Sequence, residues 1–356
     1  MDFERRIKAV QKKIRELKLD GLIITNRKNI YYLCNFTGDS GIMFISRNGS
    51  FLITDYRFEG EIVEKIKNSE WILTRKGYVE ELAQSKFFKN KKIIGFEAGS
   101  MSYSHFLYFK KTLKRSLKPV ENIVEDLRTT KEKEEIEIMK KAAKIADMAL
   151  SETIDFIKVG VMEKDIANEL EYRMRKYGGE GASFETIVAS GKRSAIPHGT
   201  ASSKKIKNNE FLIIDFGTYY KGYASDCTRT FFVGKPKSKD KEIFDVVFNA
   251  QKLVREKITL KMNFKDIDNI AREYITSRGY GERFTHSLGH GVGLFVHEPP
   301  TLSPKSNGYL KEGMVVTIEP GVYIKDYGGV RIEDMVVFLD GKKIFLTSFP
   351  RELQTL

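Results

Sequence analysis

The sequence predicts an α+β protein of two domains, a smaller N-terminal α/β domain over residues 1–125 and a larger domain over residues 126–356. Three observations support this prediction. The chain has 356 residues, and this length is more than one compact domain usually needs; 41% of the residues are hydrophobic, enough to bury a large core. Short apolar segments alternate with amphipathic ones up to about residue 122. Beyond the charged junction at Glu125–Lys131, two long helical patterns precede strand-rich sequence.

The N-terminal region begins with an amphipathic pattern, DFERRIKAVQKKIRELKLD, that predicts a helix within residues 2–20. The segments GLIITN, GIMFIS and SFLITD predict short strands that are separated by turn-forming residues. KKIIGFEA and SYSHFLYFKKTLK follow as a strand and a helix. His105, in the last of these segments, matches no motif, and we interpret it as structural.

The composition excludes several classes of protein. The net charge is +13, but lysines alternate with acidic residues instead of forming the aromatic-studded basic stripes that bind nucleic acid. No apolar stretch reaches the roughly 18 to 20 residues of a membrane span, and the first residues lack a signal-peptide core. Only Cys34 and Cys227 are present, so a disulfide framework is not expected. We therefore expect a cytoplasmic protein that binds neither nucleic acid nor a membrane.

Two long helical patterns open the C-terminal domain, over residues 133–158 and 163–177. The second is expected to end at Gly178–Gly179, because glycine commonly follows the last turn of a helix. The segment 210–234, EFLIIDFGTYYKGYASDCTRTFFVG, then predicts two antiparallel strands around a tip at Tyr220–Lys221.

Two aspartates are expected to face each other in this hairpin. Pairing about the tip places Asp215 opposite Asp226, with Cβ atoms about 4.5 to 5.5 Å apart. Opposed carboxylates repel unless one is protonated or a cation lies between them, and a metal ion would satisfy both. The alternative is a register shifted by one residue, which turns the two aspartates to opposite faces as ordinary strand-end residues.

A second hairpin repeats this arrangement in residues 314–338, MVVTIEPGVYIKDYGGVRIEDMVVF. Pairing centred on Asp326 places Glu319 opposite Glu333, and each lies in an apolar strand. Because a buried carboxylate without a partner is costly, these positions also indicate a ligand.

One histidine would complete a metal site of this kind. Residues 286–300, HSLGHGVGLFVHEPP, hold three of the five histidines, and Gly289 and Gly291 allow close backbone approach around His290. Four carboxylates and His290 would hold two divalent ions at the ~3.5 to 4 Å spacing of two-metal hydrolases. An oxygen-rich set with one nitrogen favours Mn²⁺ or Co²⁺, with Zn²⁺ as the alternative.

The order Asp215, Asp226, His290, Glu319 and Glu333, within IPHGT, DFGTYYKGYASDCTRT, GHGVGLFVHEPP, TIEPGVY and GVRIEDMVV, resembles the proline-specific pita-bread metallopeptidases. That branch holds the Xaa-Pro aminopeptidases and Xaa-Pro dipeptidases. The resemblance covers the chain from about Leu127 onward, and the N-terminal domain is similar to the creatinase-like domain of the same branch. It implies a pita-bread catalytic domain, five metal ligands with Asp226 and Glu333 bridging the ions, and a homodimer.

The resemblance also implies roles beside the substrate for His198 and His297, in contact with the proline carbonyl or stabilising the tetrahedral intermediate. His286 stays open between a partner of a metal ligand, a wall of the pocket and a polar residue before a turn. Arg331 lies two residues before Glu333, on the same strand face, and is expected to hold a ligand carboxylate. The alternative for Arg331 is a surface ion pair.

The sequence favours an Xaa-Pro aminopeptidase, with an Xaa-Pro dipeptidase as the alternative. The dipeptidases of the branch tend to place an arginine after the His-Glu-x-Pro segment to bind the proline carboxylate, and here that residue is Thr301, with only Lys305 nearby. A methionine aminopeptidase usually lacks an N-terminal domain of this kind. A creatinase, or a binding protein on a degenerate pita-bread fold, would not need five intact ligands. The expected partner is therefore a proline-containing peptide substrate.

Overall fold

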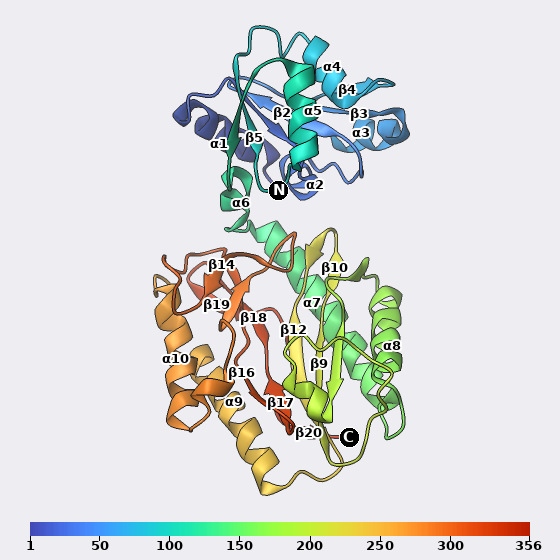
Figure 1. Ribbon diagram of the computed structural model, residues 1–356, viewed down its shortest axis with the longest axis vertical. Helices are drawn as coiled ribbons and strands as arrows, with labels where there is room; N and C mark the ends of the chain where they lie inside the picture. The colour runs from blue at the N-terminus through green and yellow to red at the C-terminus, as the bar shows by residue number, and fades with distance from the viewer. The chain divides into compact units, whose positions relative to one another are not determined.

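The computed structural model describes residues 1–356, which divide into two compact units, Met1–Arg128 and Thr129–Leu356 (Figure 1). Each unit has its own sheets and helices. None of the helices combines the length and the apolar character that crossing a membrane requires.

The N-terminal unit is built on one mixed six-stranded sheet with the strand order β4-β3-β2-β1-β5-β6. Its strands are β1 (Gly21–Ile24), β2 (Ile42–Ser46), β3 (Ser50–Asp55), β4 (Glu70–Thr74), β5 (Ile93–Glu97) and β6 (Ser116–Val120). The central strand β1 pairs antiparallel with β2 and parallel with β5. Residues on both faces of the central strands are buried, so both faces of the sheet are covered.

The helices of this unit are α1 (Phe3–Glu16), α2 (Arg27–Cys34), α3 (Glu59–Lys65), α4 (Tyr78–Gln84), α5 (Tyr103–Leu113) and α6 (Ile123–Arg128), with a 3₁₀ turn η1 (Tyr56–Phe58). Helix α1 buries Ile7, Val10 and Ile14, as its predicted amphipathic stripe requires. Helices α4 and α5 pack onto one sheet face through Leu82 and Phe109. His105 lies exposed on α5.

The helices of the C-terminal unit are α7 (Lys133–Thr153), α8 (Glu163–Lys176), α9 (Ser238–Lys257) and α10 (Phe264–Ser277), with 3₁₀ turns η2 (Ile154–Phe156), η3 (Gly191–Ala195) and η4 (Gly281–Arg283). Helices α7 and α8 share one hydrophobic core with β9 and β12. Helices α9 and α10 share another with β15 to β18 (Figure 1). Gly178, with a φ of +93°, follows α8 at the predicted helix end.

Two larger sheets of this unit carry the strands that the sequence singled out. One has the order β20-β12-β9-β8, and the other has the order β14-β13-β15-β18-β19. The first contains β8 (Ile187–Ser190), β9 (Glu210–Phe216), β12 (Cys227–Val233) and β20 (Gln354–Thr355). The second contains β13 (Gly289–Gly291), β14 (Glu298–Leu302), β15 (Val315–Ile318), β18 (Asp334–Leu339) and β19 (Lys342–Phe345). Shorter strands are β7 (Gly181–Ala182), β10 (Thr218–Tyr220), β11 (Tyr223–Ala224), β16 (Gly321–Ile324) and β17 (Gly328–Arg331).

The register of the first predicted hairpin was wrong by two residues. Thr228, not Asp226, pairs with Asp215, because the chain turns at Lys221–Gly222, one residue later than predicted. Both turn residues have a positive φ, as a two-residue hairpin loop requires. A shift of two residues preserves the face of a strand, so Asp215 and Asp226 still lie on the same side.

The register of the second hairpin is confirmed. Gly321 pairs with Arg331, and Ile318 pairs with Asp334, so both parts of the ladder are centred on Asp326. Glu319 and Glu333 occupy the short break between these two parts. Glu319 and Glu333 therefore occupy opposing positions on two neighbouring segments.

Candidate metal centre and substrate pocket

A pocket of about 720 Å³ opens between the two larger sheets of the C-terminal unit. It is lined by every residue to which the sequence analysis assigned a role: Asp215, Asp226, His290, Glu319, Glu333, His198, His286, His297 and Arg331. These residues come from positions between 198 and 333, so the fold gathers side chains that are far apart in the sequence.

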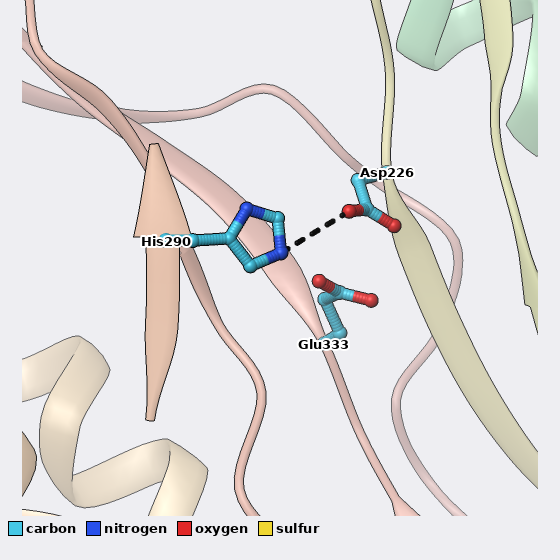
Figure 2. A group of neighbouring side chains, drawn as sticks. All are labelled: Asp226, His290 and Glu333. Atoms are coloured by element: carbon cyan, nitrogen blue, oxygen red, sulfur yellow. Dashed lines mark ion pairs between the residues drawn. The ribbon is translucent and has the colours of Figure 1, made fainter. Parts of the chain in front are cut away.

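Asp226, His290 and Glu333 converge within this pocket from three different segments (Figure 2). One possible ligand atom from each lies within 4.8 Å of the others, which is close enough for a single ion. His290 Nε2 is 3.6 Å from Asp226 Oδ2 and 3.2 Å from Glu319 Oε1. The histidine thus connects a carboxylate beside the first sheet with one beside the second.

Two of these carboxylates are each held through one oxygen, while the other oxygen has no partner. Arg331 Nη2 donates to Asp215 Oδ2 at 2.6 Å, and Thr228 Oγ1 donates to Glu333 Oε2 at 2.8 Å. Asp215 Oδ1 and Glu333 Oε1 are buried and accept no hydrogen bond. Because buried carboxylate oxygens are costly without a donor or a cation, these two atoms fit the requirements of metal ligands.

The orientation of His290 also suits metal binding. Its Nδ1 lies 3.1 Å from the carbonyl oxygen of Gly291, so Nδ1–H donates there and Nε2 is the nitrogen that faces the acidic cluster. The Thr317 hydroxyl accepts the His290 N–H at 3.0 Å and lies 3.1 Å from Glu319 Oε1, to which it donates. A Cβ at Gly289 would lie 2.1 Å from Thr317 O, so the close backbone approach predicted for this glycine is present.

The electrostatics of the cluster call for positive charge. Burial, and then the charge of Asp215, raises the pKa of Asp226 well above its usual value. Burial, and then the charge of Asp226, does the same to the pKa of Glu333. Burial would lower the pKa of His290, but Glu319 and Asp226 together raise it to about 9. The site therefore retains protons where divalent cations would otherwise compensate the carboxylates.

Arg331 connects several parts of the pocket. Its guanidinium bonds Asp215, Thr228 Oγ1 at 3.1 Å and Tyr323 Oη at 2.8 Å. It also donates to the carbonyl oxygen of Pro197 at 3.2 Å, next to His198. Arg331 is 3% exposed, which excludes the alternative of a surface ion pair.

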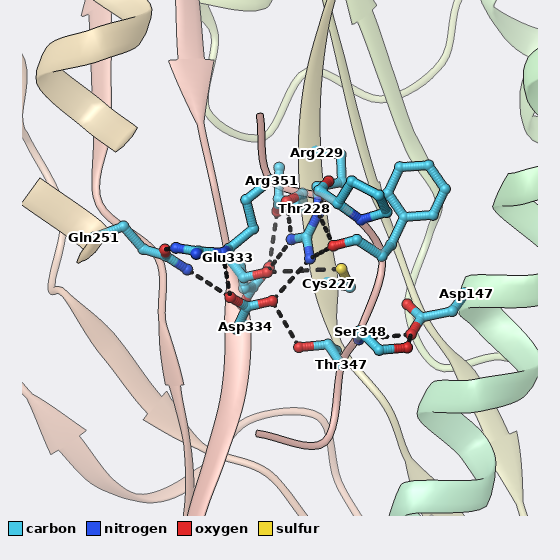
Figure 3. A network of polar contacts seen from close by, with 12 residues as sticks. Asp147, Cys227, Thr228, Arg229, Gln251, Glu333, Asp334, Thr347, Ser348 and Arg351 are labelled. Atoms are coloured by element: carbon cyan, nitrogen blue, oxygen red, sulfur yellow. Dashed lines mark hydrogen bonds and ion pairs between the residues drawn. The ribbon is translucent and has the colours of Figure 1, made fainter. Parts of the chain in front are cut away.

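A second polar network adjoins the strands that carry Thr228 and Glu333 (Figure 3). Arg229, 2% exposed, donates to the main-chain oxygens of Thr228 and Glu333 and to Asp334 Oδ1 at 2.8 Å. Asp334 also accepts from Gln251 at 2.7 Å, and it pairs with Arg255. Because Glu333 lines the pocket and Thr228 donates to its carboxylate, this network fixes the main chain behind both residues.

The three remaining histidines differ in their surroundings. His297 and His198 are exposed on loops, and the His297 ring lies 4.2 Å from the His290 ring. Partial burial of the ring lowers the pKa of His297, and nearby His290 lowers it further, which favours a neutral imidazole. His286 Nδ1 contacts Ser287 O and its Nε2 lies 3.0 Å from Tyr323 Oη, so His286 reaches Arg331 only through Tyr323.

Sequence reasoning missed several residues that support or line this site. Thr228 lies two residues after Asp226, and Tyr323 lies two residues after Gly321. Because every second side chain of a strand points to the same face, this spacing is the signal that could have identified both residues. Glu298 forms an ion pair with buried Lys131 at 3.5 Å. The two residues lie on distant segments, and no local sequence pattern predicts their contact. Glu185, which also lines the pocket, lies in an irregular segment between β7 and β8.

Comparisons with known proteins agree with this geometry. Residues 137–339 match the model of metallopeptidase family M24, and residues 6–130 match the Creatinase/Prolidase N-terminal domain. An Xaa-Pro dipeptidase of Pyrococcus furiosus is 41% identical over 99% of this chain and 100% of its own length.

Two solved structures share the fold over nearly the whole chain. An Xaa-Pro dipeptidase from Bacillus anthracis superposes with a TM-score of 0.97 at 40% identity, covering 99% of this chain and 100% of its own. An X-Pro aminopeptidase from Thermotoga maritima has a TM-score of 0.90 at 37% identity, covering 97% and 100%.

Proposed function

We propose a peptidase activity for this chain from the premise that it belongs to metallopeptidase family M24, whose model its C-terminal unit matches. Its fold is a creatinase-type N-terminal domain followed by a pita-bread catalytic domain. The specific activity that we propose is that of an Xaa-Pro dipeptidase, which releases proline from a dipeptide. The observation that carries this proposal is the similarity, at 40% identity or more over nearly the full length, to two proteins named Xaa-Pro dipeptidase.

Membership of this family implies divalent metal ions, and the residues present fit them. Asp215 Oδ1 and Glu333 Oε1 are buried without donors, and the Nε2 of His290 faces the acidic cluster. We propose that Asp215, Asp226, His290, Glu319 and Glu333 hold two ions, with Mn²⁺ or Co²⁺ preferred and Zn²⁺ as the alternative. Such ions lower the pKa of bound water and polarise the scissile carbonyl.

The chain's own side chains would orient the substrate around this centre. His297, which lines the pocket beside His290, is placed to donate a hydrogen bond to the oxygen that becomes negative during attack. His198 lines the same pocket and is placed to contact the proline carbonyl. Arg331 fixes Asp215 and the Pro197 carbonyl together, so it sets the position of the His198 loop relative to the ligands.

Proline selectivity follows from its tertiary amide. The proline nitrogen has no N–H and the ring fixes φ, so a pocket built for this ring binds few other residues. Pro197 and Val296 line the pocket beside the two histidines and supply apolar contact. We propose that they flank the ring.

One observation favours the aminopeptidase activity, which the sequence analysis preferred. Thr301, where the dipeptidases tend to have arginine, lines the pocket, and Arg331 is the only lysine or arginine that does so. Because Arg331 is already bonded to Asp215, the pocket walls offer no uncommitted cation for a proline carboxylate. The aminopeptidase therefore remains the second candidate, also because the Thermotoga maritima structure carries that name.

Product analysis of Ala-Pro and Ala-Pro-Ala, measured side by side after metal loading, separates the two candidates. A dipeptidase should give a kcat/KM for Ala-Pro at least tenfold above that for the tripeptide. Equal or faster release of alanine from the tripeptide would establish the aminopeptidase instead.

Thr301→Arg, with Thr301→Gln as an uncharged control, adds a second measurement. If nothing in the native pocket binds the carboxylate, the arginine should favour Ala-Pro by about tenfold or more, because a charged hydrogen bond contributes ~1.5 to 3 kcal/mol. In a native dipeptidase the carboxylate already has a partner, so Thr301→Arg should change the ratio by less than threefold. The expected homodimer and the cytoplasmic location stay predictions, to be tested by sedimentation and by fractionation.

A further inference from the structure

The segment between β7 and β8 carries two extra residues relative to its partner strand. Ala182 pairs with Thr218, and the Ser183 N–H donates to Gly217 O at 3.0 Å. The ladder resumes only where Ile187 pairs with Asp215. Residues 184–186 therefore face a single residue of the partner strand and form a bulge, a device that redirects side chains beside active sites.

The bulge is anchored at both ends. Ser183 Oγ donates to Ser225 O at 2.8 Å, directly before Asp226. At the other end, Thr186 Oγ1 donates to Glu171 Oε1 at 2.7 Å. A Cβ at Gly217 would lie 1.9 Å from Ser225 O and 2.4 Å from Ser183 Oγ, so the chain is tightly packed where the bulge begins. Phe184 and Glu185 project from this fixed base and line the pocket.

Glu185 is the one pocket carboxylate that nothing in the chain engages. Asp215, Asp226, Glu319 and Glu333 belong to the proposed metal site, and Glu298 pairs with Lys131. Glu185 is exposed, and it makes neither a hydrogen bond nor an ion pair. Two divalent ions would balance the four ligand carboxylates, so a negative charge at Glu185 would remain on the pocket wall.

An Xaa-Pro substrate has two groups that this charge can attract. The proline carboxylate is negative and is repelled, which leaves the α-ammonium group and a cationic side chain on the first residue. The α-ammonium is adjacent to the scissile carbonyl and therefore lies at the buried ligand cluster. Glu185 is exposed on a different segment from the ligands, where the end of a long side chain can reach it. Phe184 and Ile187 provide apolar surface for the methylene stem.

We propose that Glu185 is a specificity-determining residue that favours substrates with lysine or arginine before proline, an inference that rests on the proposed Xaa-Pro activity. The uncharged stem packs along Phe184 and Ile187, and the cationic end pairs with the Glu185 carboxylate. Because the pair is solvent-exposed, it contributes a modest preference that salt weakens.

The test compares kcat/KM for Lys-Pro with that for norleucyl-proline, which has a similar stem without the charge. Glu185→Gln should lower the ratio of the two by about fivefold, the factor that corresponds to ~1 kcal/mol for an exposed ion pair. Glu185→Lys should lower it further and should raise the rate for Glu-Pro relative to norleucyl-proline. Glu137→Gln, which removes an exposed charge on α7 outside the pocket, is the matched control and should leave the ratio unchanged.

An unchanged ratio in both Glu185 variants would overturn the proposal. Equal losses on Lys-Pro and norleucyl-proline would overturn it too, because they would place the α-ammonium group at Glu185. Failure of the unmodified protein to cleave any Xaa-Pro peptide, in contrast, would contradict the proposed function itself and remove the basis of this inference.

Discussion

Replacing Asp226 by asparagine should separate the stability of the metal-free protein from the stability that metal adds. Asp226 is 4% exposed, and burial and Asp215 together raise its pKa well above the usual value. The metal-free carboxyl has to bind a proton to avoid an unfavourable charge there, whereas the amide is always neutral, so metal-free Asp226→Asn should melt no lower than the unmodified protein. With metal, the same substitution should cost stability, because the carboxylate that we propose as a metal ligand becomes a weak one.

The size of the effect follows from binding linkage. An ion at 100 times its Kd stabilises the folded protein by about 2.7 kcal/mol. For a unit of roughly 150 to 250 residues, each kcal/mol corresponds to about 2 to 4 °C, so each occupied site should raise Tm by about 5 to 11 °C. We expect Mn²⁺ to raise the Tm of the unmodified protein by that amount per ion, and that of Asp226→Asn by less than half as much.

Differential scanning calorimetry with chelator and with Mn²⁺ measures both quantities on the same samples. Asp147→Asn is the matched control, because Asp147 is a buried acid of the same unit that lies outside the pocket. It should retain the full metal-induced rise in Tm. An equal metal-induced rise in Asp226→Asn and the unmodified protein would refute the placement of Asp226 among the ligands.

Three further substitutions test other parts of the structure. His297→Ala should lower kcat by about 10²-fold or more with unchanged metal content, as measured by steady-state kinetics and elemental analysis, and a matching loss of metal would identify His297 as a ligand. Arg229→Met leaves the Asp334 carboxylate without a principal partner and should lower the free energy of unfolding by about 3 to 5 kcal/mol in denaturant titrations; a loss below 1 kcal/mol would contradict this. Burial raises the pKa of Glu97 from 4.5 to about 7, so the stability linked to this group is fully present below pH 4.5 and is lost as the pH rises to about 7. The free energy of unfolding should fall by ~3 kcal/mol over this range. Fluorescence of the single tryptophan, Trp71, reports this unit, and Glu97→Gln should flatten its pH dependence; an unaltered pH profile would show that Glu97 is not responsible.

The parts of the fold that the sequence predicted correctly are those with strong local periodicity. Helix α1 and the strands β1 to β3 follow simple apolar patterns, and the second acidic hairpin keeps its register because its turn at Asp326 is symmetric. The first hairpin slipped by two residues because its turn residues, Lys221 and Gly222, are as compatible with one tip as with the next. The error did not change which face of the strand Asp215 and Asp226 occupy, so the predicted cluster still forms.

The contacts that hold the site together could not be predicted in the same way. Arg229 reaches Asp334, and Lys131 reaches Glu298, across more than a hundred residues of sequence. The bulge that presents Glu185 depends on the register of two strand pairs, neither of which has a local signature. Such features arise from tertiary packing and not from periodicity.

Hydrolysis of Ala-Pro during stepwise addition of Mn²⁺ to metal-free protein tests the central claim most directly. Five ligands that hold two ions predict no activity without metal, a rise with added Mn²⁺, and a plateau at about two equivalents per chain. Hydrolysis of Ala-Pro by fully metal-free protein, or no hydrolysis at any amount of Mn²⁺, Co²⁺ or Zn²⁺, would contradict the assignment of this cluster as a dinuclear Xaa-Pro peptidase centre.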